Sequence, residues 1–134
     1  VYKRQREYSP EYWPQEVGLE RLIKLDKPEF LGRDAYLAIK DNAPREKLVV
    51  VQIEQTESDA NGGEPVFLTD GTPVGRVSSG SYGHSVGASI ALCFIKTQQA
   101  AAGTQLDIAI LGIPHRAVIL EKPPFDAAGE RLRA

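Results

Sequence analysis

The residues most able to do chemistry gather at positions 78–96, in the stretch SSGSYGHSVGASIALCFIK. A backbone loop that cradles phosphate has either the pattern G-x-x-x-x-G-K-[ST] or the pattern G-x-G-x-x-G between a strand and a helix. Gly80, Gly83 and Gly87 are spaced three and four residues apart, no lysine follows them, and the next segment has a strand pattern. The stretch therefore predicts a glycine-permitted bend between neighbouring strands.

The other reactive side chains also favour structural roles. His84 and His115 lie far apart, with no cysteine or carboxylate at metal-ligand spacing. Cys93 lies in an apolar run, where a free thiol behaves as a small hydrophobic group, and no serine of the stretch sits in a G-x-S-x-G elbow. A solvated loop explains the acidic residues around the NGG sequence at 61–63, which are Glu54, Glu57, Asp59 and Glu64. We predict no catalytic residue and no metal ligand.

Length, composition and charge limit the number of domains and the classes of partner that the chain can have. The chain has 134 residues, of which 42% are hydrophobic and 25% charged, with a net charge of −2. This length and this apolar content suffice for one domain with its own core. The small net charge gives no reason to expect nucleic acid or an anionic membrane as a partner. No apolar run approaches the roughly 20 residues of a membrane helix, and a signal-peptide pattern is missing. We expect a soluble, cytoplasmic protein.

The first part of the chain, up to about Pro44, is predicted to hold one short helix. We interpret residues 1–5, VYKRQ, as a non-native end. After a stretch rich in proline and aromatic residues, apolar residues recur with the helical period of 3.6 residues, and Asn42 and Pro44 end this pattern. One face of this helix is predicted to carry the apolar residues Leu31, Ala35, Ala38 and Ile39. The opposite face carries the charged residues Arg33, Lys40 and Asp41.

After Pro44 the hydrophobic period changes to two, which indicates strands. Asp70–Gly71 predicts a hairpin turn, and Gly112–Pro114 separates the last two strand patterns. About six short strands at this spacing favour an antiparallel barrel or a sandwich. The predicted core-facing residues are Val49, Val51, Ile53, Val77, Leu92, Phe94, Leu106, Ile108, Ile110 and Val118.

Three blocks of sequence resemble the glycine-cleavage T-protein family. PQEVGLERLIKLDKPEFLGRDAYL at 14–37 is similar to a family pattern in which P-x-E-A-G-L leads into L-D-K-x-D-F-I-G-R-x-A-L. GGEPVFLTDGTPVGRVSSGSYGHSVGASIAL at 62–92 and GTQLDIAILGIPHRAVILEKPPFD at 103–126 resemble later blocks, in the same order and at matching spacing. The V-G-x-S ending of the second block fits the dimethylglycine and sarcosine dehydrogenase branch, whose members are FAD-dependent oxidoreductases.

The resemblance implies a domain organisation. Residues 6–46 would be the C-terminal remnant of a folate-binding α+β domain, 47–126 a β-barrel of jelly-roll type, and 127–134 a tail. The expected fold is mainly β, a six-stranded antiparallel barrel preceded by a short helical remnant. The implied partners are an upstream folate-binding domain of the same parent chain and, in the dehydrogenase branch, an FAD domain. A eukaryotic parent would reside in the mitochondrial matrix.

The resemblance also implies tetrahydrofolate as the cofactor of a one-carbon transfer, with FAD bound by the parent and not by this segment. Such a transfer needs a carboxylate for the pterin ring, basic groups for the anionic tail and an acid/base aspartate. The family pattern places the pterin glutamate just before Val1 and the aspartate further upstream. Lys27 maps to a basic folate contact, and Arg33 either assists it or forms an ion pair at the helix start. Phe125 lacks the hydroxyl that an aromatic residue supplies near this point in T-proteins.

Two functional hypotheses follow from the sequence. The first is a fragment of a tetrahydrofolate-dependent aminomethyl or methylene transfer enzyme, close to the dimethylglycine and sarcosine dehydrogenases. The second is a non-catalytic binding or scaffolding module that keeps the fold without folate chemistry. A G-x-G-x-x-G motif and an L-R-L-E block upstream in the parent would favour the first hypothesis.

For residues 6–134 alone we expect no turnover and at most weak affinity for tetrahydrofolate, because the implied glutamate and aspartate lie outside this segment. Calorimetric titration with tetrahydrofolate measures this directly. Binding in the micromolar range would contradict the expectation.

Overall fold

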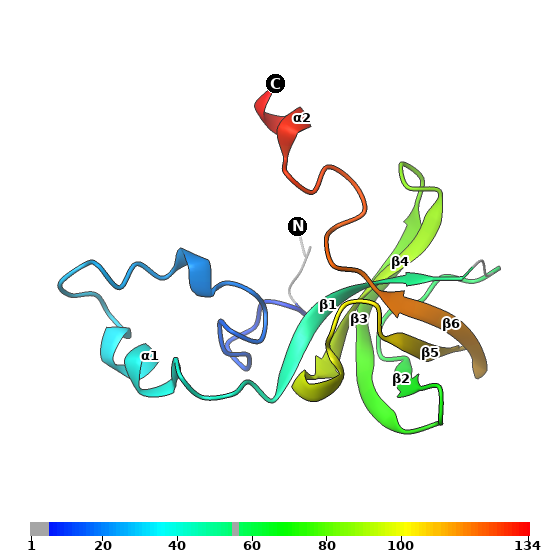
Figure 1. Ribbon diagram of the computed structural model, residues 1–134, viewed down its shortest axis with the longest axis horizontal. Coiled ribbons are helices and arrows are strands. Elements are labelled where there is room, and N and C mark those ends of the chain that lie inside the picture. Colours follow the sequence, from blue (N-terminus) through cyan, green and yellow to red (C-terminus); the bar gives the residue numbers. More distant parts are fainter. Residues whose placement is uncertain (1–5, 55–56) are drawn as a thin grey trace.

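The computed structural model describes residues 6–54 and 57–134 and shows a β-barrel with a smaller lobe beside it (Figure 1). The predicted non-native end, residues 1–5, lies outside the described residues. Within the described ranges, no helix has the length and apolar character needed to cross a membrane. The elements in chain order are η1 (Glu20–Leu22), α1 (Arg33–Ile39), β1 (Glu46–Ile53), β2 (Pro65–Leu68), β3 (Pro73–Gly83), β4 (Ala88–Lys96), η2 (Thr97–Gln99), β5 (Gln105–Ile110), β6 (Ile113–Ile119) and α2 (Glu130–Arg133).

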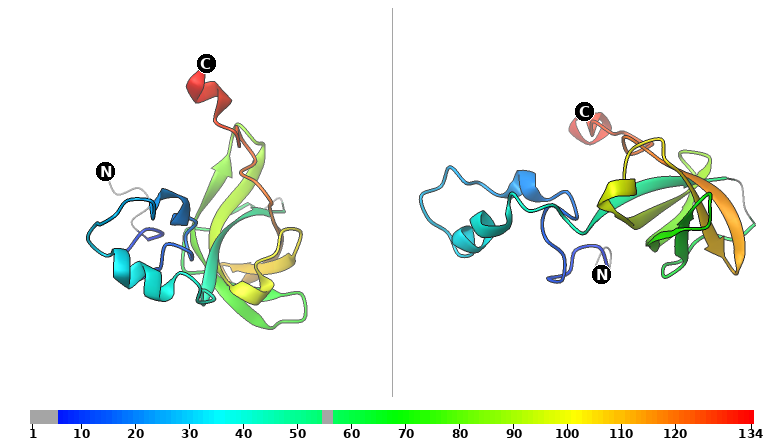
Figure 2. Two further views of the ribbon diagram at one scale, coloured as in Figure 1. Left: turned by 60° about the vertical axis from the view of Figure 1, so that its left-hand side comes forward. Right: turned by 60° about the horizontal axis from the view of Figure 1, so that its bottom comes forward.

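Six antiparallel strands close into a barrel in the order β1-β4-β3-β2-β5-β6. β1 completes the ring, because it pairs with β4 from Glu46 opposite Lys96 onward and also with β6, where Val51 lies opposite Ile119. Figure 2 shows this ring from two further sides. The mainly β fold and the six-stranded antiparallel barrel are confirmed, and the sandwich alternative is wrong.

Alternate side chains of each strand fill the barrel interior. In β5, Leu106, Ile108 and Ile110 point inward as predicted, and all three are buried. The interior cluster consists of Val51, Ile53, Ala60, Val66, Val74, Val77, Ala91, Cys93, Ile95, Leu106, Ile108, Ile110, Ala117 and Ile119, with Val49 packed against it. Removing these apolar side chains from water is the main favourable contribution to folding of the barrel.

Two predicted core residues are wrong. Leu92 and Val118 are only half-buried and lie in the outward phase of their strands, while their neighbours Cys93 and Ile119 point inward. The cause is that β4 and the end of β6 are apolar on almost every residue, so no alternation is present from which the phase could be read. Phe94 is buried as predicted, but it belongs to the outer face of β4.

The glycine-rich stretch is mostly strand and only partly bend. β3 continues through Gly83, and the turn to β4 occupies residues 84–87, so the bend predicted from residue 78 is wrong over its first half. Gly80 has a packing role within the strand, since a Cβ atom there would lie 2.6 Å from the carbonyl oxygen of Ala60. The stretch does connect two neighbouring strands, as predicted.

The two predicted hairpin turns differ in outcome. The Asp70–Gly71 turn between β2 and β3 is confirmed, with Gly71 at φ 85°. The hairpin between β5 and β6 is confirmed, but its turn is Leu111–Gly112, with φ values of 50° and 81°, and not 112–114, because Ile113 and Pro114 already belong to β6. Positive φ at both central residues is typical of the two-residue turn that matches strand twist. Leu111 misled the prediction because a bulky residue rarely adopts positive φ.

The lobe comprises residues 20–44 and lies to one side of the barrel (Figures 1 and 2). None of its residues is buried. The predicted helical face is wrong, because Leu31 precedes α1 and is fully exposed, and Ala35 and Ala38 are exposed as well. Gly32, with φ 87°, breaks the helical path before Arg33 and so removes Leu31 from the helix.

We predict that amides of residues 20–40 exchange hydrogen faster than those of β1 and β4. A seven-residue helix without a buried face is marginal in water, whereas the barrel strands surround a closed core. Hydrogen exchange followed by mass spectrometry or NMR measures the difference. Equal protection of α1 and the central strands would contradict it.

Candidate functional site

Residues 6–19, which we call the arm, lie across the outer face of the barrel and connect it to the lobe. Their anchor is Phe94, which points outward from β4 yet is only 1% exposed. The ring of Tyr12 stacks on it with 4.2 Å between centroids and 14° between planes. A stacked aromatic pair contributes about 0.5–1.5 kcal/mol beyond the contribution of the apolar area that it buries. The arm therefore covers an aromatic residue that the barrel alone would expose.

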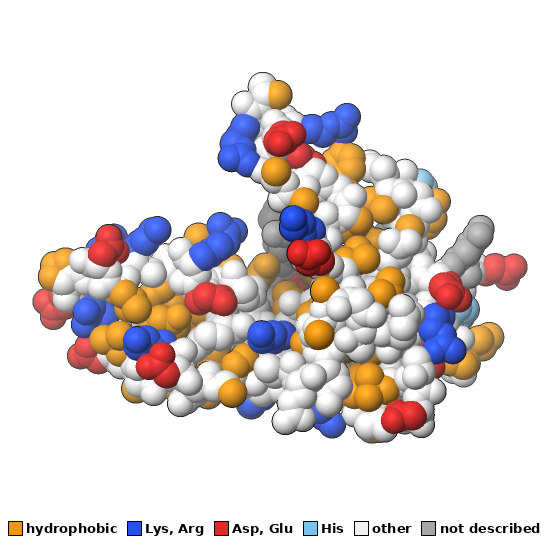
Figure 3. All heavy atoms as spheres, in the orientation of Figure 1, with side chains coloured by type: hydrophobic (Ala, Val, Ile, Leu, Met, Phe, Trp, Pro, Cys, Tyr) orange, Lys and Arg blue, Asp and Glu red, His pale blue; other side chains and the backbone are white. Residues whose placement is uncertain are grey.

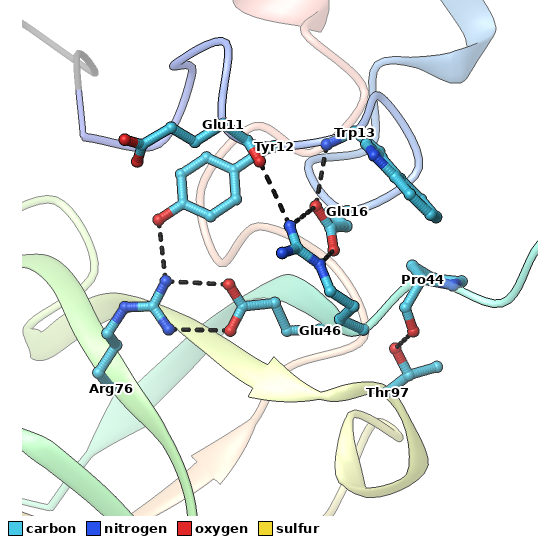
Figure 4. Close-up of polar contacts among 9 residues, drawn as sticks. Glu11, Tyr12, Trp13, Glu16, Pro44, Glu46, Arg76 and Thr97 are labelled. Carbon is cyan, nitrogen blue, oxygen red and sulfur yellow. Dashed lines mark hydrogen bonds and ion pairs between the residues drawn. The ribbon is translucent and has the colours of Figure 1, made fainter. Parts of the chain in front are cut away.

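An ion pair between Arg76 and Glu46 lies beside Tyr12 (Figure 4). Arg76 of β3 donates two hydrogen bonds to Glu46 of β1, at 2.8 and 2.9 Å, across the intervening strand β4. It also donates to the Tyr12 hydroxyl at 2.8 Å, and its guanidinium lies 4.9 Å from the Phe94 ring centroid. The hydrogen bonds that Arg76 donates to the Glu46 carboxylate raise the pKa of Arg76. This fixed fork sets the position of Tyr12.

A buried carboxylate joins the arm to the start of β1. The side chain of Glu16 is fully buried, and it accepts hydrogen bonds from the Trp13 backbone N–H at 2.9 Å and from Arg45 at 3.0 and 3.1 Å. The carbonyl oxygen of Glu16 accepts from the Leu48 backbone N–H at 2.7 Å. Burial alone would raise the pKa of Glu16, but the bonds from Arg45 and Trp13 outweigh it and lower the pKa. Glu16 therefore stays ionised while shielded from water.

A second buried carboxylate, Glu7, holds the other end of the arm. One of its oxygens accepts hydrogen bonds from the hydroxyls of Ser78 and Ser79, at 2.6 and 2.7 Å. Adjacent residues of a regular strand point to opposite faces, but a register shift between Val77 and Ser79 bends β3 and lets both hydroxyls reach one atom. Burial would raise the pKa of Glu7, and these two bonds offset it and lower the pKa.

The junction of arm and barrel is built to hold the chain in place and not to react. Its carboxylates are occupied by internal donors. Burial raises the pKa of the Cys93 thiol to about 12, so this residue behaves as a small hydrophobic group, as predicted. Over residues 6–54 and 57–134, no group of three histidine, cysteine or acidic side chains is arranged to hold a metal ion.

The acidic loop is only partly the solvated loop that was predicted. Glu54, Glu57 and Asp59 are exposed. Glu64 is half-buried and accepts from the backbone N–H groups of Asn61 and Gly62, at 2.8 and 2.7 Å. Burial would raise the pKa of Glu64, and these backbone bonds lower it. This carboxylate shapes the loop.

Both predicted folate-contacting residues, Lys27 and Arg33, lie in the lobe, away from the junction. Lys27 is exposed, and its ammonium forms no ion pair within the part of the chain that the structure describes. Arg33 is half-buried and lies 3.8 Å from the Asp34 carboxylate, which is the local ion pair weighed as its alternative role. Its Nε atom is buried without a hydrogen-bond partner, beside a hollow lined by residues 28–35.

Sequence reasoning missed the residues that build the junction. Glu16 was part of the P-x-E-x-G-L pattern but received no role, and Glu7, Arg45 and Arg76 were passed over. Each lies in a polar stretch where a charged side chain is expected to be solvated. The available signal was Glu16 itself, a carboxylate next to the apolar Val17, because a carboxylate that is buried together with its apolar neighbour requires a cation or other donors nearby.

Known proteins share this architecture. A closed six-stranded barrel with an arm on its outer face defines a small β-barrel domain, and residues 46–126 match the family described as the glycine cleavage T-protein C-terminal barrel domain. The chain belongs to this family, which confirms the resemblance seen in the sequence. A crystal structure of the glycine cleavage system aminomethyltransferase T from Bartonella henselae superposes with a TM-score of 0.80 at 21% identity, over 91% of this chain and 34% of that chain.

Curated relatives extend the similarity beyond the barrel. The mitochondrial dimethylglycine dehydrogenase of Homo sapiens is 34% identical over 111 residues, covering 82% of this chain and 13% of that protein. The 4-methylaminobutanoate oxidase (formaldehyde-forming) of Paenarthrobacter nicotinovorans is 35% identical over 127 residues, with coverage of 90% and 14%. The aminomethyltransferase of Symbiobacterium thermophilum is 34% identical over 126 residues, with coverage of 93% and 33%. The chain thus spans a third or less of these relatives.

We predict that acid weakens the attachment of the arm. A carboxylate whose folded pKa is lowered contributes stability above its unfolded pKa, near 4.5, and loses it as the pH falls through the folded value. Glu16→Gln should lower the free energy of unfolding by about 1–3 kcal/mol at pH about 7, and the difference from the wild type should shrink at pH about 3. Urea unfolding at both pH values measures it.

The matched control is Asp107→Asn, which removes a carboxylate from the partly exposed Arg116–Asp107 pair, 3.4 Å apart. We expect a change below about 1 kcal/mol there. A Glu16→Gln difference that stays constant between the two pH values would contradict the assignment of Glu16 as an ionised, buried group.

Proposed function

We propose that this chain is the C-terminal region of a tetrahydrofolate-dependent one-carbon transfer enzyme, namely a dimethylglycine or sarcosine dehydrogenase-like oxidoreductase. The observation that carries the proposal is that the similarity covers arm and lobe as well as barrel, up to 93% of the chain, in relatives named as dehydrogenase, oxidase and aminomethyltransferase. Residues 6–46 would then complete a folate-binding domain, with 47–126 as the barrel domain and 127–134 as a tail.

The basic residues of the lobe suit the anionic tail of a folate. Lys27 is exposed and unpaired within the described residues, and Arg33 has a buried Nε donor that no acceptor satisfies. A carboxylate of the tail would accept from both groups, in keeping with the preference of Arg and Lys for such anions. Tetrahydrofolate, when bound, supplies the nitrogen that takes up the one-carbon unit. The role of this segment is to hold and orient the tail.

The partners that follow from this proposal are further parts of the same parent chain. Apolar side chains of the lobe lie uncovered between charged ones, among them Leu22 and Leu31 (Figure 3). A preceding folate-binding region would cover them, and any FAD would be bound further upstream. The human relative is named mitochondrial, which supports the matrix as the compartment of a eukaryotic parent. The names of the relatives support an enzyme over a scaffolding module.

A chimera tests this function. Residues 6–134 would replace the matching third of the Symbiobacterium thermophilum aminomethyltransferase. We expect the chimera to retain tetrahydrofolate-dependent transfer, and Lys27→Ala within it to raise KM for tetrahydrofolate about tenfold, with kcat nearly unchanged, because a tail contact contributes equally to ground and transition states. Arg33→Ala should act in the same direction.

Lys24→Ala is the matched control, since Lys24 is also an exposed lysine of the lobe but has no assigned contact. Its KM for tetrahydrofolate should equal that of the parent chimera. A folded chimera without tetrahydrofolate-dependent transfer would overturn the proposed function, and equal KM values for Lys27→Ala and Lys24→Ala would overturn the folate contact.

A further inference from the structure

Few contacts fix the orientation of the lobe relative to the barrel. The lobe has no buried residue, so no apolar core of its own fixes it to the barrel. Within the described residues, two side-chain hydrogen bonds join it to the rest of the molecule. Gln15 donates to the carbonyl oxygen of Ile39, the last residue of α1, at 3.2 Å, and Thr97 donates to the carbonyl oxygen of Pro44 at 2.6 Å. The bond from Thr97 to Pro44 lies at the end of the lobe, directly before β1, so it fixes only this connection and not the rest of the lobe.

The chain segment at 13–18, which we call the elbow, is the part of the arm next to the lobe, and it contacts both the lobe and the start of β1. Gln15 bonds to the end of α1, whereas Glu16, the next residue, bonds to Arg45 beside β1. Val17 is buried against this junction, and Gly18, with φ 69°, turns the chain toward the lobe. Two consecutive side chains thus connect two bodies that otherwise touch little.

We propose that the elbow fixes the orientation of the lobe relative to the barrel, with Glu16 as a positioning residue that acts through Arg45. Arg45 also donates to the carbonyl oxygen of Glu11 at 3.3 Å, and its guanidinium lies 5.9 Å from the Trp13 ring centroid. The guanidinium therefore holds three residues of the arm, Glu11, Trp13 and Glu16, beside the start of β1. Figure 4 shows Glu11, Trp13 and Glu16, the three residues of the arm that contact this cation.

The carboxylate is specifically required at this position. One oxygen of Glu16 accepts from Arg45 Nε, and the other accepts from an Arg45 terminal nitrogen and from the Trp13 N–H. An amide in its place would turn an NH₂ group toward one of these donors, whichever way it is rotated. Glu16→Gln keeps the shape of the side chain but breaks at least one bond of the elbow.

The consequence for function builds on the proposed folate contacts. Lys27 and Arg33 lie in the lobe, so the elbow would set where they stand relative to the barrel and to any preceding region. A loosened elbow would move both basic groups together. The orientation of the lobe is nevertheless measurable without folate, so this inference and the proposed function can fail separately.

The test is a distance measurement between two spin labels on the full chain. Leu31→Cys labels the lobe, and Thr69→Cys labels the turn between β2 and β3; both positions are exposed. The native Cys93 is buried with a pKa of about 12 and stays unlabelled. Pulsed electron spin resonance at neutral pH gives the distribution of distances. We expect Glu16→Gln, and separately Gln15→Ala, to at least double its width.

Asp107→Asn serves as the control, because it makes the same change of carboxylate to amide in an ion pair between β5 and β6. Its distribution should match the wild type. Unchanged widths in both elbow variants would overturn the inference. Should Glu16→Gln make Cys93 reactive, which reports opening of the barrel, Gln15→Ala decides: a broadened distribution with protected Cys93 supports the elbow, and an unchanged one overturns it.

Discussion

A carboxylate removed from water needs hydrogen-bond donors, and this requirement organises the docking of the arm, residues 6–19, on the barrel. Glu16 finds donors for both of its oxygens in Arg45 and in the backbone of Trp13, whereas one oxygen of Glu7 accepts from two serine hydroxyls of β3. The arm has too few buried apolar residues to dock by hydrophobic contact alone. The hydrogen bonds of the buried carboxylates fix the orientation of the arm on the barrel, because these bonds form in one geometry only.

The barrel provides the fixed surface on which these contacts depend. Its interior is filled by small and branched apolar side chains, and its outer face presents Phe94 and Arg76 at defined positions. The register shift in β3 follows the same logic, since it brings two neighbouring hydroxyls to one side of the strand. Docking of the arm therefore uses irregularities of the strands as well as their regular alternation.

The sequence predicted the barrel well because strand period and turn residues are local signals. Val51, Ile53 and Ile108 follow the alternation and were placed correctly, whereas Leu92 and Val118 lie in runs where both faces are apolar and no phase can be read. The spacing of Leu31 predicts that it belongs to the helix, but Gly32 has a left-handed backbone conformation, so α1 begins only at Arg33. The junction escaped prediction because the partner of Glu16 lies 29 residues away, and pairing of that range depends on the fold itself.

Closure of the ring through β1 and β6 has a consequence for how such a domain is combined with others. Adjacent first and last strands bring the entrance and the exit of the barrel to neighbouring places on its surface. A unit of this kind can be grafted onto larger polypeptides without stretching either connection. This agrees with its occurrence in relatives of which the matched portion makes up anything from 13% to 33%.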